Sequence, residues 1–312
     1  MTIIKQDRSQ PVYLDITGWL TFFMLVVMRN TFTLSEVPLV QVERISTGFE
    51  FLDLCYGKTM YGHKVIAGLP VGAVSLWSGS PGVGKTRVGI AVCVSANRLG
   101  HRVMFIQNEV TPEQFRQWTA NQVSFPDEFL IHTTSDLDKQ IADVMAFRPH
   151  IIVVDSLNMI PHYQSSDVIR DIAKSYKEVV QEIQGHVILI SHLNKAGVVK
   201  GNNDIQYMVD VECTIEKYED VLAREYTRKQ LAIGDYPQDR VTKTDIPRTF
   251  ILTFIKNRYG PTSVGGTENF VCFRHIGDGI EVVTSNFDNP KWCNEDAPVA
   301  IEKKSRRWLF WR

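Results

Sequence analysis

Cysteine is scarce in this sequence of 312 residues, and no two cysteines stand close together. Without a C-x-x-C pair, neither a zinc module nor a disulfide framework is indicated. The chain is long enough to build a core without such support. The thiols are therefore expected to stay reduced, which favours a cytoplasmic location. The 5 cysteines are Cys55, Cys93, Cys213, Cys272 and Cys293.

Long apolar runs are missing as well. The most apolar stretch, residues 19–28, is about half as long as the roughly 20 residues that a membrane-spanning helix needs, and Asp15 and Arg29 flank it. Asp7 and Asp15 precede the run and no small-residue cleavage site follows it, which does not fit a secretory signal. We therefore expect no membrane partner, and interpret this run as an element that packs on the main domain or on a neighbouring subunit.

An excess of charge of one sign is also absent. The sequence has 34 Lys+Arg residues against 35 Asp+Glu residues, for a formal net charge of -1. The whole molecule therefore does not bind nucleic acid through its average field, and any such binding has to come from local patches. A hydrophobic fraction of 44% and a charged fraction of 22% are those of an ordinary globular protein, which excludes wholesale disorder and coiled coil.

Short apolar runs of strand-forming residues alternate with helical stretches from about residue 72 onward. One helix is marked by apolar residues at helical spacing after the start signal at residues 165–167. Continuous apolar strands that alternate with helices predict an α/β fold, with a mainly parallel sheet covered by helices on both faces. Past Asn203 the pattern becomes strand-rich, which predicts antiparallel strands added to the same sheet. The expected strands are residues 73–77, 103–107, 129–132, 151–154, 187–190, 208–215, 249–255, 270–273 and 280–283.

A phosphate-binding loop is predicted directly after the first of these strands and directly before a helix that runs to about Leu99. Its glycines let backbone N–H groups turn toward the phosphates of ATP at the positive end of that helix. Lys85 is expected to contact the β and γ phosphates, and the Thr86 hydroxyl to ligate Mg²⁺. The residues that match G-x-x-x-x-G-K-[ST] are Gly79, Ser80, Pro81, Gly82, Val83, Gly84, Lys85 and Thr86.

Two carboxylates follow predicted strands. Asp155 ends the run at residues 151–154, at the edge of the sheet where open α/β folds bind ligands, and is expected to hold the Mg²⁺ shell. Glu109 closes the stretch at residues 103–109, whose strand is expected to lie beside the first one. Glu109 could polarise the water that attacks the γ-phosphate, or it could simply open the next helix near Thr111. The strand at residues 187–190 is followed by His192, which could sense the γ-phosphate or be a solvated side chain.

Further motifs surround this site. They are Arg44-Ile45-Ser46-Thr47-Gly48 and Leu52-Asp53 before the loop, then Phe105 to Glu109, Ile152 to Leu157, His192 to Gly197, Met208-Val209-Asp210 and Lys256-Asn257-Arg258-Tyr259-Gly260. Together they resemble the bacterial RadA (Sms) branch of the RecA-like ATPases, which is related to the hexameric helicases of DnaB type. The last motif is similar to the K-N-R-F-G signature of that family. The resemblance covers roughly residues 34–285.

The resemblance implies roles for individual residues. Glu109 matches the catalytic glutamate, and His192 the residue that reports the γ-phosphate to the DNA-binding loop. Lys256 and Arg258 match a pair that reaches the ATP of the neighbouring subunit; the residues alone would also fit the solvated face of a turn before Gly260. The loop is implied to continue to about Gln206, and its DNA-binding residues would be Lys195, Lys200, Asn202 and Asn203.

The chain also departs from the family. Its four-cysteine zinc module and its Lon-protease-like domain are not expected here. The glycine run expected after Asp53 is stretched over residues 56–64, and a polar stretch at about residues 217–247 separates two late strands. We therefore expect an N-terminal extension at residues 1–43, an ATPase core at 44–285 and a tail at 286–312. Residues 303–312 combine cations with aromatic side chains, and could bind nucleic acid, dock on a recombinase or replication partner, or be a solvated end.

The sequence thus predicts a Mg²⁺-dependent ATPase of RecA-like fold that binds single-stranded DNA. The resemblance implies a ring, expected to be hexameric, or a filament, with ATP at the subunit interfaces and with branch migration or translocation in recombination and repair as the outcome. Three alternatives remain open at this point. They are a replicative helicase of DnaB type, a recombination mediator in which ATP only switches assembly, and a clock-type or signalling ATPase without a DNA role.

Overall fold

The computed structural model describes residues 35, 41–119, 125–126, 129–160, 166–192, 204–218, 220–221, 249–262, 269–276 and 279–285. The chain divides into two compact units, residues 1–41 and 42–312, and every element discussed below lies in the second. The apolar run at residues 19–28, most of the stretch at 217–247, Cys293 and the tail at 303–312 lie outside the described residues. Among the helices of the described part, none is both long and apolar enough to cross a membrane.

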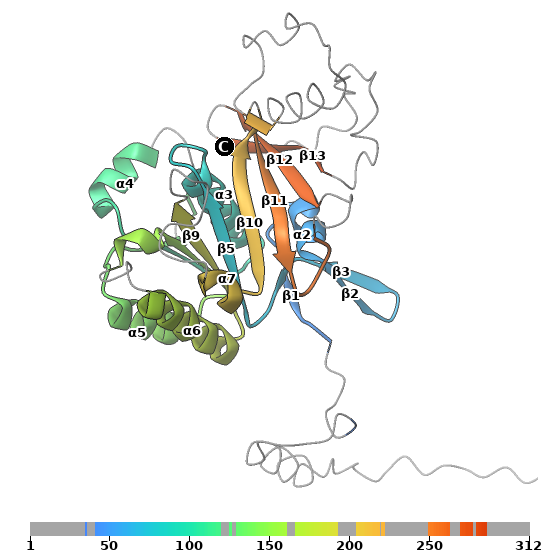
Figure 1. Ribbon diagram of the computed structural model, residues 1–312, viewed down its shortest axis with the longest axis horizontal. Helices are drawn as coiled ribbons and strands as arrows, with labels where there is room; N and C mark the ends of the chain where they lie inside the picture. The colour runs from blue at the N-terminus through green and yellow to red at the C-terminus, as the bar shows by residue number, and fades with distance from the viewer. Residues whose placement is uncertain are drawn as a thin grey trace, which may run out of the picture. The chain divides into compact units, whose positions relative to one another are not determined.

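A nine-stranded sheet forms the centre of the second unit (Figure 1). Its strands lie in the order β13-β12-β11-β10-β5-β9-β8-β6-β7. Neighbouring strands run parallel from β7 to β10, whereas β10 to β13 pair antiparallel. The predicted α/β fold, with antiparallel strands toward the C-terminus, is therefore confirmed. The strands are β5 (Ala73–Gly79), β6 (Val103–Gln107), β7 (Leu130–His132), β8 (Ile151–Asp155), β9 (His186–His192), β10 (Val211–Lys217), β11 (Thr249–Asn257), β12 (Phe270–Ile276) and β13 (Gly279–Ser285).

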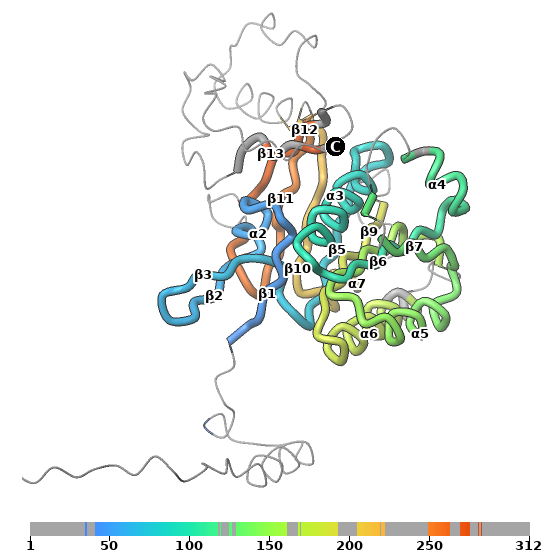
Figure 2. Tube along the Cα trace, turned by 180° about the vertical axis from the view of Figure 1, so that it is seen from behind, coloured from blue at the N-terminus to red at the C-terminus, as the bar shows by residue number. Residues whose placement is uncertain are grey.

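Helices cover both faces of this sheet. One apolar cluster joins α2 and α3 to one face, and a second joins α5, α6 and α7 to the other. Figure 2 shows α3 in front of the parallel strands, and the same helix lies behind them in Figure 1. The helices are α2 (Glu50–Tyr56), α3 (Lys85–Arg98), α4 (Pro112–Thr119), α5 (Leu137–Phe147), α6 (Ser166–Ile183) and α7 (Asp204–Met208), with a 3₁₀ turn at Leu157–Met159.

The central strands are mainly apolar because each supplies both clusters. In β6, Val103 and Phe105 pack with α3, and Met104 and Ile106 pack on the other face. Successive side chains of a strand point to opposite faces, so a strand covered on both sides buries nearly all of its side chains and favours apolar residues. This is the physical reason why the uninterrupted apolar runs predicted parallel strands.

One strand prediction is wrong at its start. The stretch at residues 208–215 was expected to be extended, but Met208 ends the helix α7 and β10 begins only at Val211. Ile205 and Val209 are both fully buried in the cluster below α6. Residues four apart share one face of a helix, so a helical turn buries both at once.

The stretched segment at residues 56–64 forms most of a β-hairpin. Its strands are β2 (Lys58–Tyr61) and β3 (Lys64–Ala67), which pair antiparallel. The hairpin projects from the body of the fold (Figure 1). Arg44, on the short strand β1 (Arg44–Ile45) that pairs with β4 (Leu69–Pro70), holds the hairpin base by donating to Thr59 Oγ1 at 2.9 Å and to Gly68 O at 3.0 Å.

A neutral histidine is buried at the start of the strand β9. His186 is fully buried, and its Nδ1 lies 2.8 Å from the carbonyl oxygen of Pro70. Because a carbonyl can only accept, Nδ1 carries the proton, and Nε2 accepts from the Ser75 hydroxyl at 2.8 Å. Burial lowers the pKa of His186 from 6.5 to about 4.

This histidine predicts a loss of stability in mild acid. Between pH 6.5 and about 4 the unfolded chain takes up a proton at this position and the folded chain does not, so His186 should remove about 3 kcal/mol of unfolding free energy across that window. Urea unfolding at a series of pH values would measure this, and His186→Gln should lack that part of the pH dependence. His63→Gln, at an exposed histidine of the hairpin, is the matched control. An identical pH profile for wild type and His186→Gln would contradict the prediction.

Candidate functional site

The phosphate-binding loop joins the end of β5 to the start of α3. Gly79 is the last residue of β5, and Gly84 is the N-cap of α3. Gly82 and Gly84 have φ angles of 77° and 95°, in the left-handed region that favours glycine. Val83 is only 6% exposed and anchors the loop in the core. The free N–H groups of the first turn of α3 therefore lie at the loop, which is the arrangement that binds phosphate.

Lys85 lies inside this loop. Its Nζ donates to the carbonyl oxygens of Gly79 at 2.7 Å and Ser80 at 2.9 Å. Burial lowers the pKa of Lys85 to about 8, and the carboxylates of Asp155 and Glu109 oppose that shift. A phosphate beside Nζ would favour the charged form further, so the lysine suits an anionic ligand.

Asp155 and Thr86 form the candidate metal site. Asp155 ends β8 with a residue exposure of 2%, and it forms a hydrogen bond with Thr86. Among the described residues, its Oδ2 has no hydrogen-bond partner. Burial raises the pKa of Asp155 to about 6. A buried carboxylate oxygen without a partner, next to a hydroxyl, is a donor set that fits Mg²⁺, and the cation would hold the carboxylate in its charged form.

Glu109 lies at the same edge of the sheet as Asp155. Ser156 Oγ donates to Glu109 Oε1 at 2.8 Å, and His192 Nε2 lies 3.4 Å from the same oxygen. The hydrogen bond with His192 lowers the pKa of Glu109 below its usual value, so the carboxylate is charged at neutral pH. Its side chain remains 38% exposed, which leaves it open to water.

The expectation that the strand before Glu109 lies beside the phosphate-loop strand is wrong. β8 and β9 lie between β6 and β5. The chain crosses from β5 through α3 to β6 and returns later to fill the gap. The carboxylate still reaches the site because all these strands are parallel and end at one edge.

Glu109 does not cap the helix that follows it. The start of α4 is capped by Thr111, whose Oγ1 accepts from Gln114 N at 3.3 Å, while Gln114 Oε1 accepts from Thr111 N at 3.1 Å. This reciprocal pair is a capping box with Pro112 as the first helical residue. The side chain of Glu109 instead contacts Ser156 and His192, which favours the functional alternative.

Two residues of this edge were not predicted. Ser156 is fully buried and donates to Glu109, and Asn158 Oδ1 accepts from His192 N at 3.0 Å.

A chain of further hydrogen bonds holds the backbone of Ser156. Asn108 Nδ2 donates to Ser156 O at 3.4 Å, and Gln140 Nε2 donates to Asn108 Oδ1 at 3.0 Å. In the sequence, only the position of Ser156 directly after Asp155 indicated that it could belong to the site.

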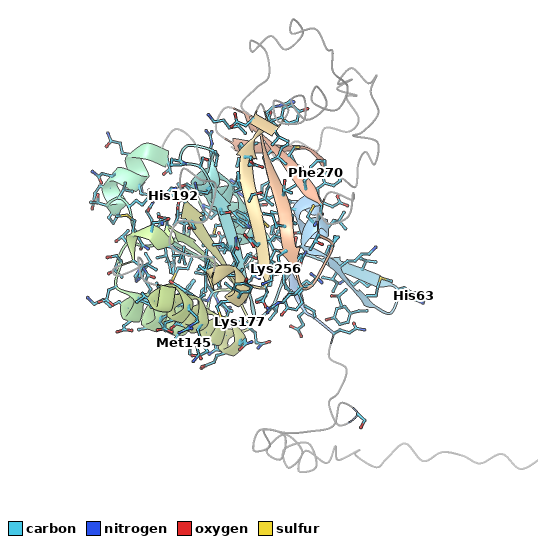
Figure 3. All side chains as sticks on the ribbon, viewed as in Figure 1. His63, Met145, Lys177, His192, Lys256 and Phe270 are labelled. Atoms are coloured by element: carbon cyan, nitrogen blue, oxygen red, sulfur yellow. The ribbon has the colours of Figure 1, made fainter. Side chains whose placement is uncertain are left out.

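Lys256 and Arg258 lie at the opposite edge of the sheet. β11 runs antiparallel to β10, so its end lies beside the start of β10 and of β5. Arg258 is level with Val74, five residues or about 17 Å before Gly79 along β5, and Lys256 is level with Leu76, three residues or about 10 Å before Gly79. Figure 3 shows His192 and Lys256 at these two edges. The two cations are therefore remote from the phosphate loop of their own chain.

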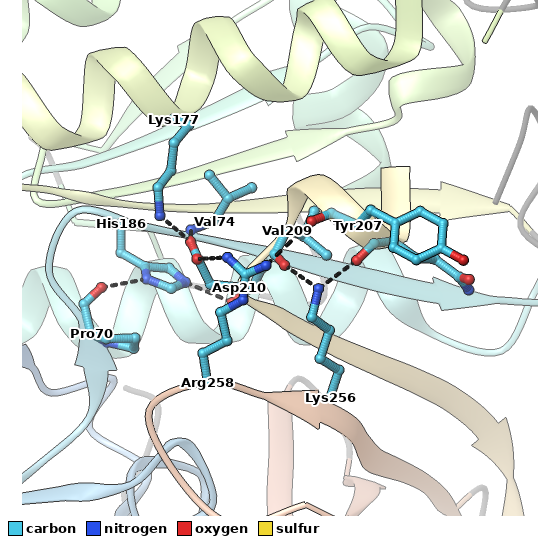
Figure 4. A network of polar contacts seen from close by, with 11 residues as sticks. Pro70, Val74, Lys177, His186, Tyr207, Val209, Asp210, Lys256 and Arg258 are labelled. Atoms are coloured by element: carbon cyan, nitrogen blue, oxygen red, sulfur yellow. Dashed lines mark hydrogen bonds and ion pairs between the residues drawn. The ribbon is translucent and has the colours of Figure 1, made fainter. Parts of the chain in front are cut away.

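Both cations bind the segment around α7. Lys256 Nζ donates to Gln206 O at 2.6 Å and Val209 O at 2.7 Å. Arg258 Nη1 donates to Asp210 Oδ1 at 3.1 Å (Figure 4). Burial, with a further contribution from the charge of Arg258, lowers the pKa of Lys256.

The predicted DNA-binding residues Lys195, Lys200, Asn202 and Asn203 lie outside the described residues. The loop was expected to continue to Gln206, but Gln206 lies within α7. Its Nε2 donates to Glu212 Oε1 at 2.6 Å, which connects the helix to the start of β10. The loop therefore ends before Asp204 in the described structure.

The chain is similar in sequence to known proteins. Residues 62–198 match the family described as AAA domain. The chain is 24% identical over 267 residues to the DNA repair protein RadA of Mycolicibacterium smegmatis, covering 81% of this chain and 49% of the relative. It is 26% identical over 189 residues to the RadA protein of Pseudomonas aeruginosa, covering 58% of this chain and 39% of the relative. The chain thus spans about half or less of these relatives.

The fold also matches a solved structure. A KaiC-like protein from the hyperthermophilic archaeon Pyrococcus horikoshii superposes with a TM-score of 0.54 at 16% identity, covering 78% of this chain and 100% of that one. At this identity the likeness concerns the fold alone. The resemblance to RadA proteins, expected from the motifs, is confirmed by the sequence matches, and the RecA-like fold by the structural match.

Proposed function

We propose that this RadA-like chain of RecA fold is a Mg²⁺-dependent ATPase with its core at residues 44–285. The observation that carries the proposal is the meeting of Lys85, Asp155 and Glu109 at one edge of the sheet. Lys85 would hold the β and γ phosphates, and Thr86 with Asp155 would hold Mg²⁺, which neutralises charge on the phosphates. Glu109, charged and open to water, would orient the attacking water and take up its proton.

We propose further that the ATPase acts on single-stranded DNA. The relatives in the comparison are named DNA repair proteins. The segment that carries Lys195 and Lys200 lies between β9, which ends at His192, and α7. His192 is 3.4 Å from Glu109, so a change at the phosphate has a short route to that segment. Hydrolysis would switch this loop between DNA-binding states, with translocation or branch migration as the result.

A ring or filament with ATP at the subunit interfaces is part of the proposal. Counted along β5, Arg258 lies about 17 Å and Lys256 about 10 Å before the start of their own phosphate loop, and both side chains are bound to the segment around α7. A cation that stabilises the transition state has to reach the phosphate, so these two residues would act on the nucleotide of another subunit. A hexameric ring is the arrangement we expect.

Single-stranded DNA should stimulate ATP hydrolysis, and the double variant Lys195→Ala/Lys200→Ala should weaken this effect. Two lost phosphate contacts would weaken DNA binding and reduce the slope of log K against log salt by about 1.4. Steady-state hydrolysis with and without poly-dT, together with fluorescence anisotropy at several salt concentrations, would measure both effects.

The matched control is Lys139→Ala/Lys174→Ala. These lysines have side chains 72% and 64% exposed on α5 and α6, where their ion-pair partners are Asp136 and Glu178, and should leave stimulation and the salt slope unchanged. Absence of both DNA binding and stimulation would refute the DNA role and leave a signalling ATPase. DNA binding without stimulation would instead favour the mediator. Unwinding of forks in preference to three-stranded substrates would favour a helicase of DnaB type.

A further inference from the structure

A buried carboxylate, Asp210, links Arg258 to the body of the fold. The side chain of Asp210 is 2% exposed and lies between α7 and β10. Its Oδ2 accepts from Val74 N at 3.0 Å and from Lys177 Nζ, and its Oδ1 accepts from Arg258 Nη1 at 3.1 Å (Figure 4). The backbone is tied as well, since Arg258 N donates to Asp210 O at 3.1 Å.

The two cations on Asp210 are not equivalent. Lys177 extends from α6 and its side chain is 23% exposed, whereas that of Arg258 is 52% exposed. The second guanidinium contact of Arg258, to Tyr207 O, is long at 3.4 Å. Arg258 is therefore the partner that can leave, and Lys177 is the one that stays.

Among the described residues, no other charged group of the surrounding elements can pair with Asp210 in place of these two cations. His186 lies near Asp210 but is neutral, because burial lowers its pKa to about 4. Glu212 is bound to Gln206 Nε2, and Lys256 to backbone carbonyls. A buried carboxylate left without a cation is strongly destabilising. The release of Arg258 would thus be opposed if Lys177 were absent.

We infer that Asp210 is a positioning residue for Arg258, and that Lys177 is the counter-ion that allows Arg258 to leave for the nucleotide of a neighbouring subunit. This inference rests on the proposed function, and it adds two residues that act through Arg258 rather than on the phosphate. While Arg258 is bound to Asp210, its guanidinium is held at the edge of the sheet. When it leaves, Lys177 keeps the buried carboxylate paired.

The same junction connects the cations to α7. The carbonyl groups that accept from Lys256 and Arg258 belong to Gln206, Tyr207 and Val209, in and directly after this helix. Movement of the cations toward a neighbour would free these carbonyls. The helix follows the segment that carries Lys195 and Lys200, so the nucleotide of one subunit would influence the DNA segment of the next.

Replacing Lys177 tests the inference in the full-length protein. Lys177→Met should lower kcat for ATP hydrolysis about tenfold with KM for ATP changed less than twofold, because Arg258 is then retained on Asp210. Lys177→Arg should restore kcat. Asp210→Asn, added to Lys177→Met, should restore much of the lost kcat, since an uncharged side chain needs no counter-ion. In an Arg258→Ala background, Lys177→Met should lower kcat per folded molecule no further, although it leaves Asp210 without a cation and should lower the stability of the double variant. Steady-state kinetics of all variants would give these values.

Lys174→Met is the matched control, since Lys174 lies one turn earlier on α6 with its side chain 64% exposed and pairs only with Glu178 among the described contacts. Binding of a fluorescent ATP analogue reports whether each variant is folded. If Lys177→Met is unfolded, the double variant Lys177→Met/Asp210→Asn decides, because it should be folded and active. An effect of Lys177→Met on kcat per folded molecule that adds to that of Arg258→Ala, or that Asp210→Asn does not relieve, overturns the inference. An inactive wild type refutes the proposed function itself.

Discussion

Replacing Arg258 with alanine is expected to lower kcat for ATP hydrolysis by about 10³-fold or more, with ATP binding retained. A cation supplied in trans stabilises charge that develops on the phosphate only in the transition state, so its loss lowers kcat and leaves the bound state intact. Arg258 lies at the amino edge of the sheet and has no access to the phosphate loop of its own chain. Steady-state kinetics and titration with a fluorescent ATP analogue would measure the two quantities.

A mixing experiment shows whether Arg258 acts in trans. Lys85→Ala lacks the phosphate contact but has an intact Arg258, and Arg258→Ala has the opposite defect. In mixed assemblies, an intact phosphate loop of one variant meets an intact arginine of the other, so activity should rise well above that of either variant alone. A mixture that remains inactive, although fluorescence energy transfer shows that subunits have exchanged, would contradict the role of Arg258 in trans.

The parts of the site that lie next to each other along the chain could be predicted from the sequence. The phosphate loop, with Lys85 and Thr86, is a local structure, because its glycines and the following helix are set by neighbouring residues. Asp155 could be predicted for a related reason, since a carboxylate that follows a buried parallel strand has to emerge at the carboxyl edge. Both predictions need only the periodicity of the strands and the direction in which they run.

The contacts between distant segments could not be predicted in this way. The order of the strands depends on how the crossover helices pack, so the sequence did not show that β8 and β9 separate β6 from β5. Ser156 lies 47 residues from Glu109, and Lys177 lies 33 residues from Asp210. Such pairs leave no periodic pattern, and only the folded chain brings them together. For the same reason, the motif at residues 208–210 did not predict the contacts of Asp210 with Lys177 and Arg258.

The two edges of the sheet have opposite electrostatic tasks. At the carboxyl edge, Asp155 and Glu109 provide negative charge for a cation and for water, with Lys85 as the positive group. At the amino edge, the cations Lys177, Lys256 and Arg258 lie beside the carboxylates Asp210 and Glu212. In the proposed assembly this excess of positive charge would complement the anionic nucleotide of the next subunit, although the net charge of the chain is -1.

Glu109→Gln is the second substitution with a large expected effect, a fall in kcat of about 10²–10⁴-fold with ATP binding retained. The amide has the shape of the carboxylate and can still accept from Ser156 Oγ, so the edge of the sheet should stay intact. It cannot take up the proton of the attacking water. Single-turnover hydrolysis, compared with binding of a non-hydrolysable analogue, would separate chemistry from binding.

The control for this substitution is Glu113→Gln, because Glu113 lies four residues further on in the first turn of α4 and is fully exposed. It should leave kcat unchanged. A small, equal effect of both substitutions would mean that Glu109 contributes only to the acidic entry of α4. A large effect of Glu109→Gln alone, together with DNA binding that no longer responds to ATP turnover, would assign both the chemistry and its coupling to the Glu109, Ser156 and His192 contact.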